Sequence, residues 1–225
     1  MPEQLSAAIL ATAKPSAMVR RLTRLDLGNV GLALLSGATV SIGFIQLLSG
    51  SLDEVANISV QVLAVQTTTL LTPLMINLLL LLRDGPLLVR LGDRLARRPA
   101  RWLRWLWWQQ AGGFVLSAIA LVPYLLAGAL VASMSTRPEL DSLTELRVLV
   151  GNLNPLMLGF SLLKTALFAA ITLWITLQQG ARAKRRGLAP TTGLSRAISI
   201  TMALVLGLDL IWALTLSPLV SGGVI

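Results

Sequence analysis

The sequence predicts an all-α, polytopic membrane protein with about five transmembrane helices and a short N-terminal interfacial helix, folded as one domain over residues 1–225. Three observations lead to this prediction. Of the 225 residues, 55% are apolar and only 13% are charged, about half the charged share of a soluble domain. Long stretches carry no charge, and the basic residues gather between those stretches. So few polar side chains cannot cover a soluble surface.

The spans follow from the apolar windows. Residues 27–52, 55–82 and 105–136 contain no charged residue, whereas 148–181 and 197–225 contain one each. A helix needs roughly 20 apolar residues to cross the hydrocarbon core, so every window can hold one span. The predicted spans lie near 28–48, 58–82, 106–132, 156–178 and 198–217. Pro73 is expected to break or kink the second span, and Pro123 to kink the third.

The orientation follows from the basic residues, 16 of the 19 of which lie in three segments. These residues are Lys14, Arg20, Arg21 and Arg24, then Arg83, Arg90, Arg94, Arg97, Arg98, Arg101 and Arg104, then Arg182, Lys184, Arg185, Arg186 and Arg196. Five spans place all three segments on one side, which the positive-inside rule assigns to the cytoplasm. The C-terminus is then expected outside. Residues 4–24, within the segment 1–25, form either an amphipathic helix on the inner leaflet or a disordered tail.

The composition also bears on chemistry, because the chain has no Cys and no His. Zinc, haem, iron–sulfur and Ser-His-Asp sites thereby lose their commonest ligands and bases. We therefore expect no metal site, no catalytic residues and no cofactor held by this chain, and a membrane-embedded enzyme is poorly supported. Function is expected to come from the packing of the spans.

The segment 83–105 combines arginines at helix-like spacing with Trp102, Trp105, Trp107 and Trp108. Arginine beside tryptophan is typical of a membrane interface, where cations meet headgroups and indoles lie at the glycerol level. One interpretation is a positive-inside loop with an aromatic belt. The other is a docking surface for a cytoplasmic subunit.

Lys164 and Asp209 are the charges expected deep within spans. An unpaired charge there costs several kcal/mol, so the simplest expectation is that the two pair with each other. The pair either pins spans four and five together or serves a substrate path or gate. In span one, small residues are expected to permit close packing, within the chain, at a dimer seam or along a lipid-lined groove. They are Ser36, Gly37, Ala38, Ser41 and Gly43.

Several motifs follow one another from residue 158 to residue 216. They are Leu162-Leu163-Lys164, a glycine near the end of the span at Gly180, the sequence Gly193-Leu194-Ser195-Arg196-Ala197, and Gly207-Leu208-Asp209 in the last span. In this order and spacing the segment resembles the C-terminal part of the MlaE/YrbE family, the permease subunits of MCE-type lipid ABC transporters. Looser similarities in the first half are Ser36-Gly37, Thr72-Pro73 and Arg83-Asp84-Gly85-Pro86.

The resemblance implies a permease subunit that passes phospholipid in a bacterial inner membrane. Its implied partners are an ABC ATPase that binds the ATP, an MCE-domain protein, and a second permease chain in a homodimer or heterodimer. The implied lipid path is lined by Gln46, Thr69, Leu70, Thr72 and Pro73, and the implied ATPase-docking residues are Arg90, Arg94, Arg97 and Arg98.

One departure from the family concerns the segment between spans two and three. The family carries an acidic coupling helix there, whereas this segment is shorter, contains no Glu and is rich in Arg. Either the chain docks a differently charged ATPase surface, or it is the divergent half of a heterodimer. The alternative function is a non-transporting scaffold whose basic loops recruit anionic lipid or a cytoplasmic partner.

Overall fold

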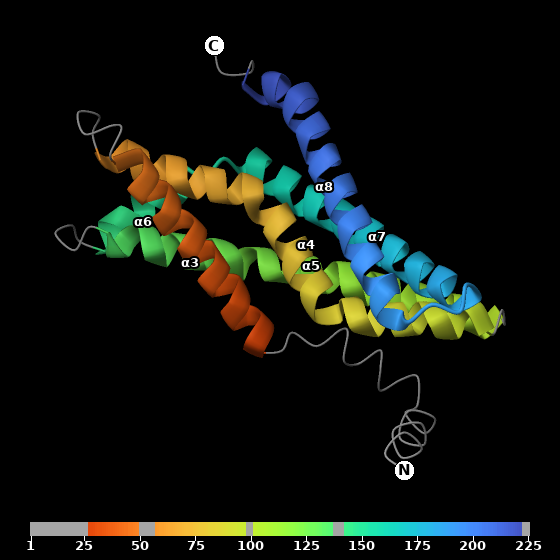
Figure 1. The fold of residues 1–225 in the computed structure, drawn as a ribbon. Helices are drawn as coiled ribbons and strands as arrows, with labels where there is room; N and C mark the ends of the chain where they lie inside the picture. Colours follow the sequence, from red (N-terminus) through yellow and green to blue (C-terminus); the bar gives the residue numbers. More distant parts are fainter. Residues whose placement is uncertain (1–26, 50–56, 98–100, 137–141, 222–225) are drawn as a thin grey trace.

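The computed structural model describes residues 27–49, 57–97, 101–136 and 142–221, and every element within them is an α-helix. The helices are α3 (Leu27–Ser49), α4 (Asn57–Arg97), α5 (Arg101–Ser135), α6 (Ser142–Gly151), α7 (Pro155–Arg185) and α8 (Pro190–Ser221) (Figure 1). Five of them, all but α6, are long and apolar enough to cross a membrane. The predicted all-α, polytopic membrane fold is confirmed. The predicted interfacial segment 1–25 lies outside the described residues.

Helix α4 corrects the predicted boundary of the second span. The prediction ended that span at residue 82, but α4 runs on for 41 residues to Arg97, with Pro73 and Pro86 inside it. Most of the segment expected to be a loop is therefore helical. A proline removes one backbone hydrogen bond, which packed neighbours can compensate within a bundle. Figure 1 shows α4 changing direction along its length, as prolines within a helix cause.

Helix α6 is an element that the sequence analysis missed. Its ten residues lie between α5 and α7, and they contact α5 and α4. Leu149 and Glu145 are buried, whereas Leu143 and Val150 are exposed. The next helix then begins at a defined point, because the Asn154 side chain accepts a 3.0 Å hydrogen bond from the Leu156 N–H and Pro155 follows the cap.

Two close helix crossings organise the bundle, and the first joins α3 to α5. A Cβ added at Gly37 would overlap the backbone carbonyl of Leu125, and one added at Gly128 would overlap that of Leu34. The two backbones therefore touch, which only glycine permits. Part of the small-residue cluster of span one thus serves a contact within the chain, whereas Gly43 has no neighbour within 4 Å.

The second crossing joins α4 to α7 by the same device. A Cβ at Gly180 would overlap the carbonyl of Val89, and one at Gly92 would overlap that of Leu177. The apolar core between the two crossings includes Ile76, Phe114, Leu121, Leu125 and Leu173.

The outside of the bundle is also apolar. Leu35 is 66% exposed, Leu210 61% and Leu214 69%. Such an exterior suits a lipid solvent, in which exposed leucine carries no penalty. The end of α4, the end of α7 and the start of α8 lie at one end of the bundle (Figure 1), so the basic residues that these helix ends contain share that end.

Candidate functional site

Polar side chains inside the bundle gather along one face of α7. The buried polar residues of this helix are Ser161, Lys164, Thr165, Thr172, Thr176 and Gln179. Spacings of three, four and seven residues place them on the same side of a helix. Where they meet α4 and α8 they form what we call the polar seam, which consists of Thr69, Asn77, Ser161, Lys164, Thr172 and Asp209.

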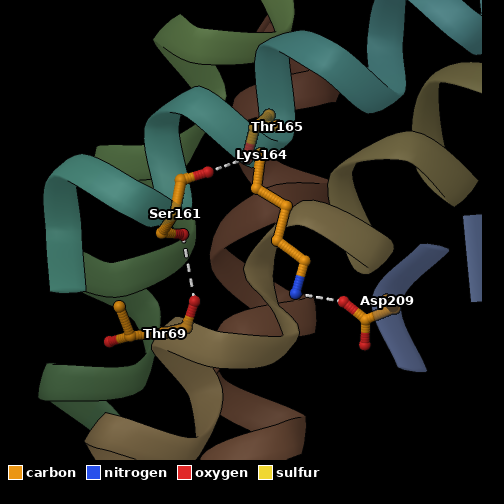
Figure 2. Close-up of polar contacts among 5 residues, drawn as sticks. All are labelled: Thr69, Ser161, Lys164, Thr165 and Asp209. Carbon is orange, nitrogen blue, oxygen red and sulfur yellow. Dashed lines mark hydrogen bonds and ion pairs between the residues drawn. The ribbon is translucent and has the colours of Figure 1, made fainter. Parts of the chain in front are cut away.

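An ion pair joins α7 to α8 in this seam. The Lys164 ammonium contacts the Asp209 carboxylate, as Figure 2 shows, so the predicted pairing is confirmed. The Lys164 side chain is only 7% exposed and that of Asp209 27%. Lys164 lies nine residues into α7, or roughly 14 Å along the helix. The pair is thus well inside the apolar part of both helices.

Aromatic rings surround the ammonium group. The Lys164 Nζ lies 5.7 Å from the ring centroid of Phe168 and 5.9 Å from that of Trp212. Trp212 in turn meets Phe160 edge to face, with ring centroids 6.1 Å apart. Ring faces attract a cation, and they do so more strongly where water is excluded. The lysine charge is therefore stabilised from two sides besides its carboxylate partner.

Two hydrogen bonds tie α4 to α7 along the seam. The Ser161 hydroxyl donates to the Thr69 carbonyl at 3.0 Å (Figure 2), and the Thr172 hydroxyl donates to the Asn77 side-chain oxygen at 2.8 Å. Thr165 instead donates to the Ser161 carbonyl of its own helix. The interhelical bonds fix the register of α4 against α7.

Two buried polar groups, one in the seam and one on α8, have no hydrogen-bond partner within the described part of the chain. They are the side-chain nitrogen of Asn77 and the hydroxyl of Thr201, whose residues are 3% and 1% exposed. An unpaired polar group in an apolar interior costs about 1–3 kcal/mol. Stability alone does not account for these residues, and this makes the seam the strongest candidate for a functional site.

The structure separates the residues predicted to line a lipid path. Thr69 and Thr72 are buried, and their hydroxyls donate to Val65 and Thr68 of the same helix at 2.8 Å. Pro73 is buried too. Leu70 is 54% exposed and Gln46 is exposed near the end of α3. Three of the five residues thus face the interior of this chain and two face outward, and a shared cleft at a dimer seam stays a prediction.

The predicted ATPase-docking arginines lie at the end of α4. Arg90 is exposed, Arg94 is half-buried and Arg97 is the last residue of the helix, whereas Arg98 lies outside the described residues. Arg90, Arg94 and Arg97 therefore belong to the end of a helix and not to a loop.

The residues singled out by the family motif have clear local roles. Gly180 allows the contact of α7 with α4 described above. A Cβ at Gly193 would lie 3.0 Å from the Ala183 Cβ, so this glycine lets the start of α8 approach the end of α7. Arg196 is exposed and lines a small cavity in the same hairpin.

Sequence reasoning missed Asn77, Ser161 and Thr172. The signal was present, because Ser161, Thr165, Thr172, Thr176 and Gln179 recur at helical spacing within a span in which the sequence analysis considered no polar side chain but Lys164. Such a stripe marks the inward face of a transmembrane helix.

In this arrangement the charged groups of Lys164 and Asp209 hold each other. Among the residues that the structure describes, no group of three or more Asp or Glu is placed to hold a metal ion. No family model, curated protein or solved structure matches this chain. The similarity to MlaE/YrbE permeases therefore remains a prediction from the sequence motifs.

Proposed function

We propose that this protein is the permease subunit of an ABC-type phospholipid transport system of a bacterial inner membrane. It works with an ATPase, an MCE-domain protein and a second permease chain, with its N-terminus cytoplasmic and its C-terminus periplasmic. The observation that carries the proposal is the Lys164–Asp209 ion pair between α7 and α8.

The ion pair favours a transporter because burying two charges costs free energy. A buried pair seldom adds stability over an apolar pair of similar size, so a passive anchor gains little by keeping one. Intramembrane charges are typical of substrate paths and gates. A pair that opens in one state and closes in another gives a bundle two arrangements whose populations an ATPase can shift.

The surface of α8 supports the second permease chain. The buried residues of this helix form a stripe, four residues apart, namely Gly193, Ala197, Thr201 and Val205, and Asp209 and Trp212 also contact α7. Elsewhere its surface carries exposed apolar residues, as at Leu206, Ile211 and Leu214. A helix that contacts its own chain so narrowly has a broad apolar face available for another subunit or for lipid acyl chains.

The alternative function, a scaffold that recruits anionic lipid or a cytoplasmic protein, is favoured by a different observation. At the end of α4, where the family has its acidic coupling helix, Arg90, Arg94 and Arg97 outnumber the one acidic residue, Asp93. A basic surface attracts anionic headgroups without any transport. The scaffold does not require the ion pair, and the transporter does not require so many arginines.

Affinity purification from native membranes in mild detergent separates the two functions. Mass spectrometry identifies the proteins and the lipids that accompany the chain. Transport predicts an ATPase, an MCE protein and bound phospholipid, and a second permease chain in the same complex would indicate a heterodimer. Recovery of the chain without an ATPase or an MCE protein would favour the scaffold.

The lipid path has its own test at Leu70. Arginine at this exposed position is expected to reduce phospholipid co-purification and transport if α4 lines the path. The matched control is Leu82→Arg, since Leu82 lies on the same helix and is 60% exposed. Unchanged lipid and transport in Leu70→Arg would remove this residue from the site.

A further inference from the structure

A cavity of about 230 Å³ lies in the hairpin between α7 and α8, away from the polar seam. Its polar lining consists of Gln179, Arg182, Arg186 and Arg196, and its apolar lining includes Leu188 and Ile200. Gln179 is 15 residues from Lys164 along α7, or roughly 22 Å. The cavity therefore lies at the basic end of the bundle and not in the candidate site described above.

The positive charge of this cavity is not neutralised by any acidic residue that the structure describes. None of its lining residues is acidic, and none of the three arginines forms an ion pair within the described residues. Gln179 adds a neutral donor. Its side chain is buried, with the residue 8% exposed, and its amide has no hydrogen bond in the part of the chain that the structure describes.

The local backbone builds the cavity. Gly187 has a φ of 66° and ends α7, with the Leu188 N–H donating to the Ala183 carbonyl at 2.9 Å and the Gly187 N–H to the Lys184 carbonyl at 3.0 Å. This is the Schellman arrangement, in which glycine accepts the left-handed conformation. Arg186 and Leu188, the neighbours of Gly187 in the turn, both line the cavity, and the missing side chain at Gly193 brings α8 close enough to add Arg196.

We propose that this cavity binds a phosphate group, supplied by an anionic phospholipid of the adjacent leaflet. Guanidinium groups bind phosphate oxygens in pairs, and three of them converge here with an amide donor. Leu188 and Ile200 are 39% and 42% exposed, so an acyl chain attached to the phosphate has apolar contacts beside the cavity. The inference goes beyond the proposed function and holds for a transporter or a scaffold.

The test uses the full-length purified chain and native mass spectrometry. Retention of phosphatidylglycerol is compared with that of phosphatidylcholine, and inorganic phosphate serves as the second probe. Arg196→Gln and Arg182→Gln are each expected to weaken phosphatidylglycerol binding about tenfold, because each removes a charge-assisted contact worth about 1.4 kcal/mol. Binding of phosphatidylcholine is expected to change little.

The matched control is Arg185→Gln. Arg185 is exposed in the same last turn of α7, and its loss changes the net charge equally, but it does not line the cavity. It is expected to leave phosphatidylglycerol retention nearly unchanged. Arg196→Lys keeps the charge without the paired geometry and is expected to restore retention in part.

The outcomes are distinct. Selective loss with Arg196→Gln and Arg182→Gln supports the lipid phosphate site. If inorganic phosphate displaces the lipid and binds as well without it, the phosphate site stands but its ligand is a soluble phosphate compound. An equal loss with Arg185→Gln would reveal only a general basic surface, and this would overturn the proposal. Absence of binding by both probes would overturn it as well and leave the arginines to an acidic protein partner.

Discussion

The α3–α5 crossing and the polar seam of α4, α7 and α8 both hold transmembrane helices together, but they do so with different side chains. The α3–α5 crossing and the α4–α7 crossing beside the seam each bring two backbones together through a reciprocal pair of glycines. The α3–α5 contact then adds an interhelical hydrogen bond, 2.8 Å between the hydroxyls of Ser41 and Ser133. The polar seam adds an ion pair, two interhelical hydrogen bonds and the side-chain nitrogen of Asn77, which has no partner in the described residues.

The difference indicates which polar residues the fold requires. The α3–α5 contact shows that glycines and one hydroxyl pair can join two transmembrane helices in this bundle. The charges and the unpaired nitrogen of the seam go beyond that requirement, and each lowers stability unless it is satisfied. We therefore assign the α3–α5 contact to structure and the seam to function.

The largest effect is expected from separating the two charges. Asp209→Leu alone should lower the free energy of unfolding by about 3–5 kcal/mol, because it leaves the buried Lys164 without its carboxylate. Lys164→Leu in the same chain should restore most of that loss. Unfolding in mild detergent of the wild type, both single variants and the double variant measures the coupling between the two. Additive effects would show that the pair does not interact.

The glycine contacts are expected to give the next largest effect, equal in the two regions. Gly180→Ala and Gly37→Ala should each cost about 1–3 kcal/mol, because the new methyl group would overlap a backbone carbonyl and force the helices apart. Gly159→Ala on α7 and Gly43→Ala on α3 are the controls, since neither glycine has a neighbour within 4 Å. Thermal unfolding compares the four variants, and equal costs in variants and controls would refute the close contacts.

A smaller effect is expected for the hydrogen bond between Thr172 and Asn77. Thr172→Val should cost about 1 kcal/mol, because it leaves the side-chain oxygen of Asn77 without its donor. Thr176→Val is the matched control. Thr176 is equally buried on α7, but its hydroxyl donates to the Thr172 carbonyl of its own helix. The same unfolding assay should therefore separate the two valine variants, and identical losses would argue against an interhelical role for Thr172.

The smallest effect is expected at Ser41. Ser41→Ala should cost only about 0.6 kcal/mol, the average for an interhelical hydrogen bond in a membrane protein. The Ser133 hydroxyl keeps its own bond to the Ala129 carbonyl at 2.8 Å and is not left unsatisfied. If Ser41→Ala lowered the free energy of unfolding as much as Asp209→Leu does in the same assay, the α3–α5 contact and the polar seam could no longer be distinguished.

The sequence predicted the number and type of the long helices because apolar windows and charge clusters are local signals. It also predicted the Lys164–Asp209 pair, because an unpaired charge is too costly in a membrane. It missed the extension of α4 to Arg97, since the charge-free window ends before Arg83 and only packing shows that the helix continues. It missed α6 because that short helix adjoins the apolar window of the fourth span.

The candidate site was only partly predictable for a similar reason. Thr69, Leu70 and Thr72 are neighbours in sequence, but the faces that they occupy depend on how α4 packs against the other helices. The cavity arginines were visible as a basic cluster. Only the turn at Gly187 and the approach of α8 divide that cluster into residues that line the cavity and residues such as Arg185 that do not.

The most direct test of our central claim is phospholipid transfer by the complex isolated with the Lys164→Leu/Asp209→Leu double variant. Replacing both charges leaves a folded chain in our account, so the assembly and its unfolding temperature should stay close to those of the wild type. Transfer should nevertheless fall by about tenfold or more, since a switch worth at least about 1.4 kcal/mol is removed. Wild-type transfer by the double variant would contradict the account and reduce the pair to a structural contact.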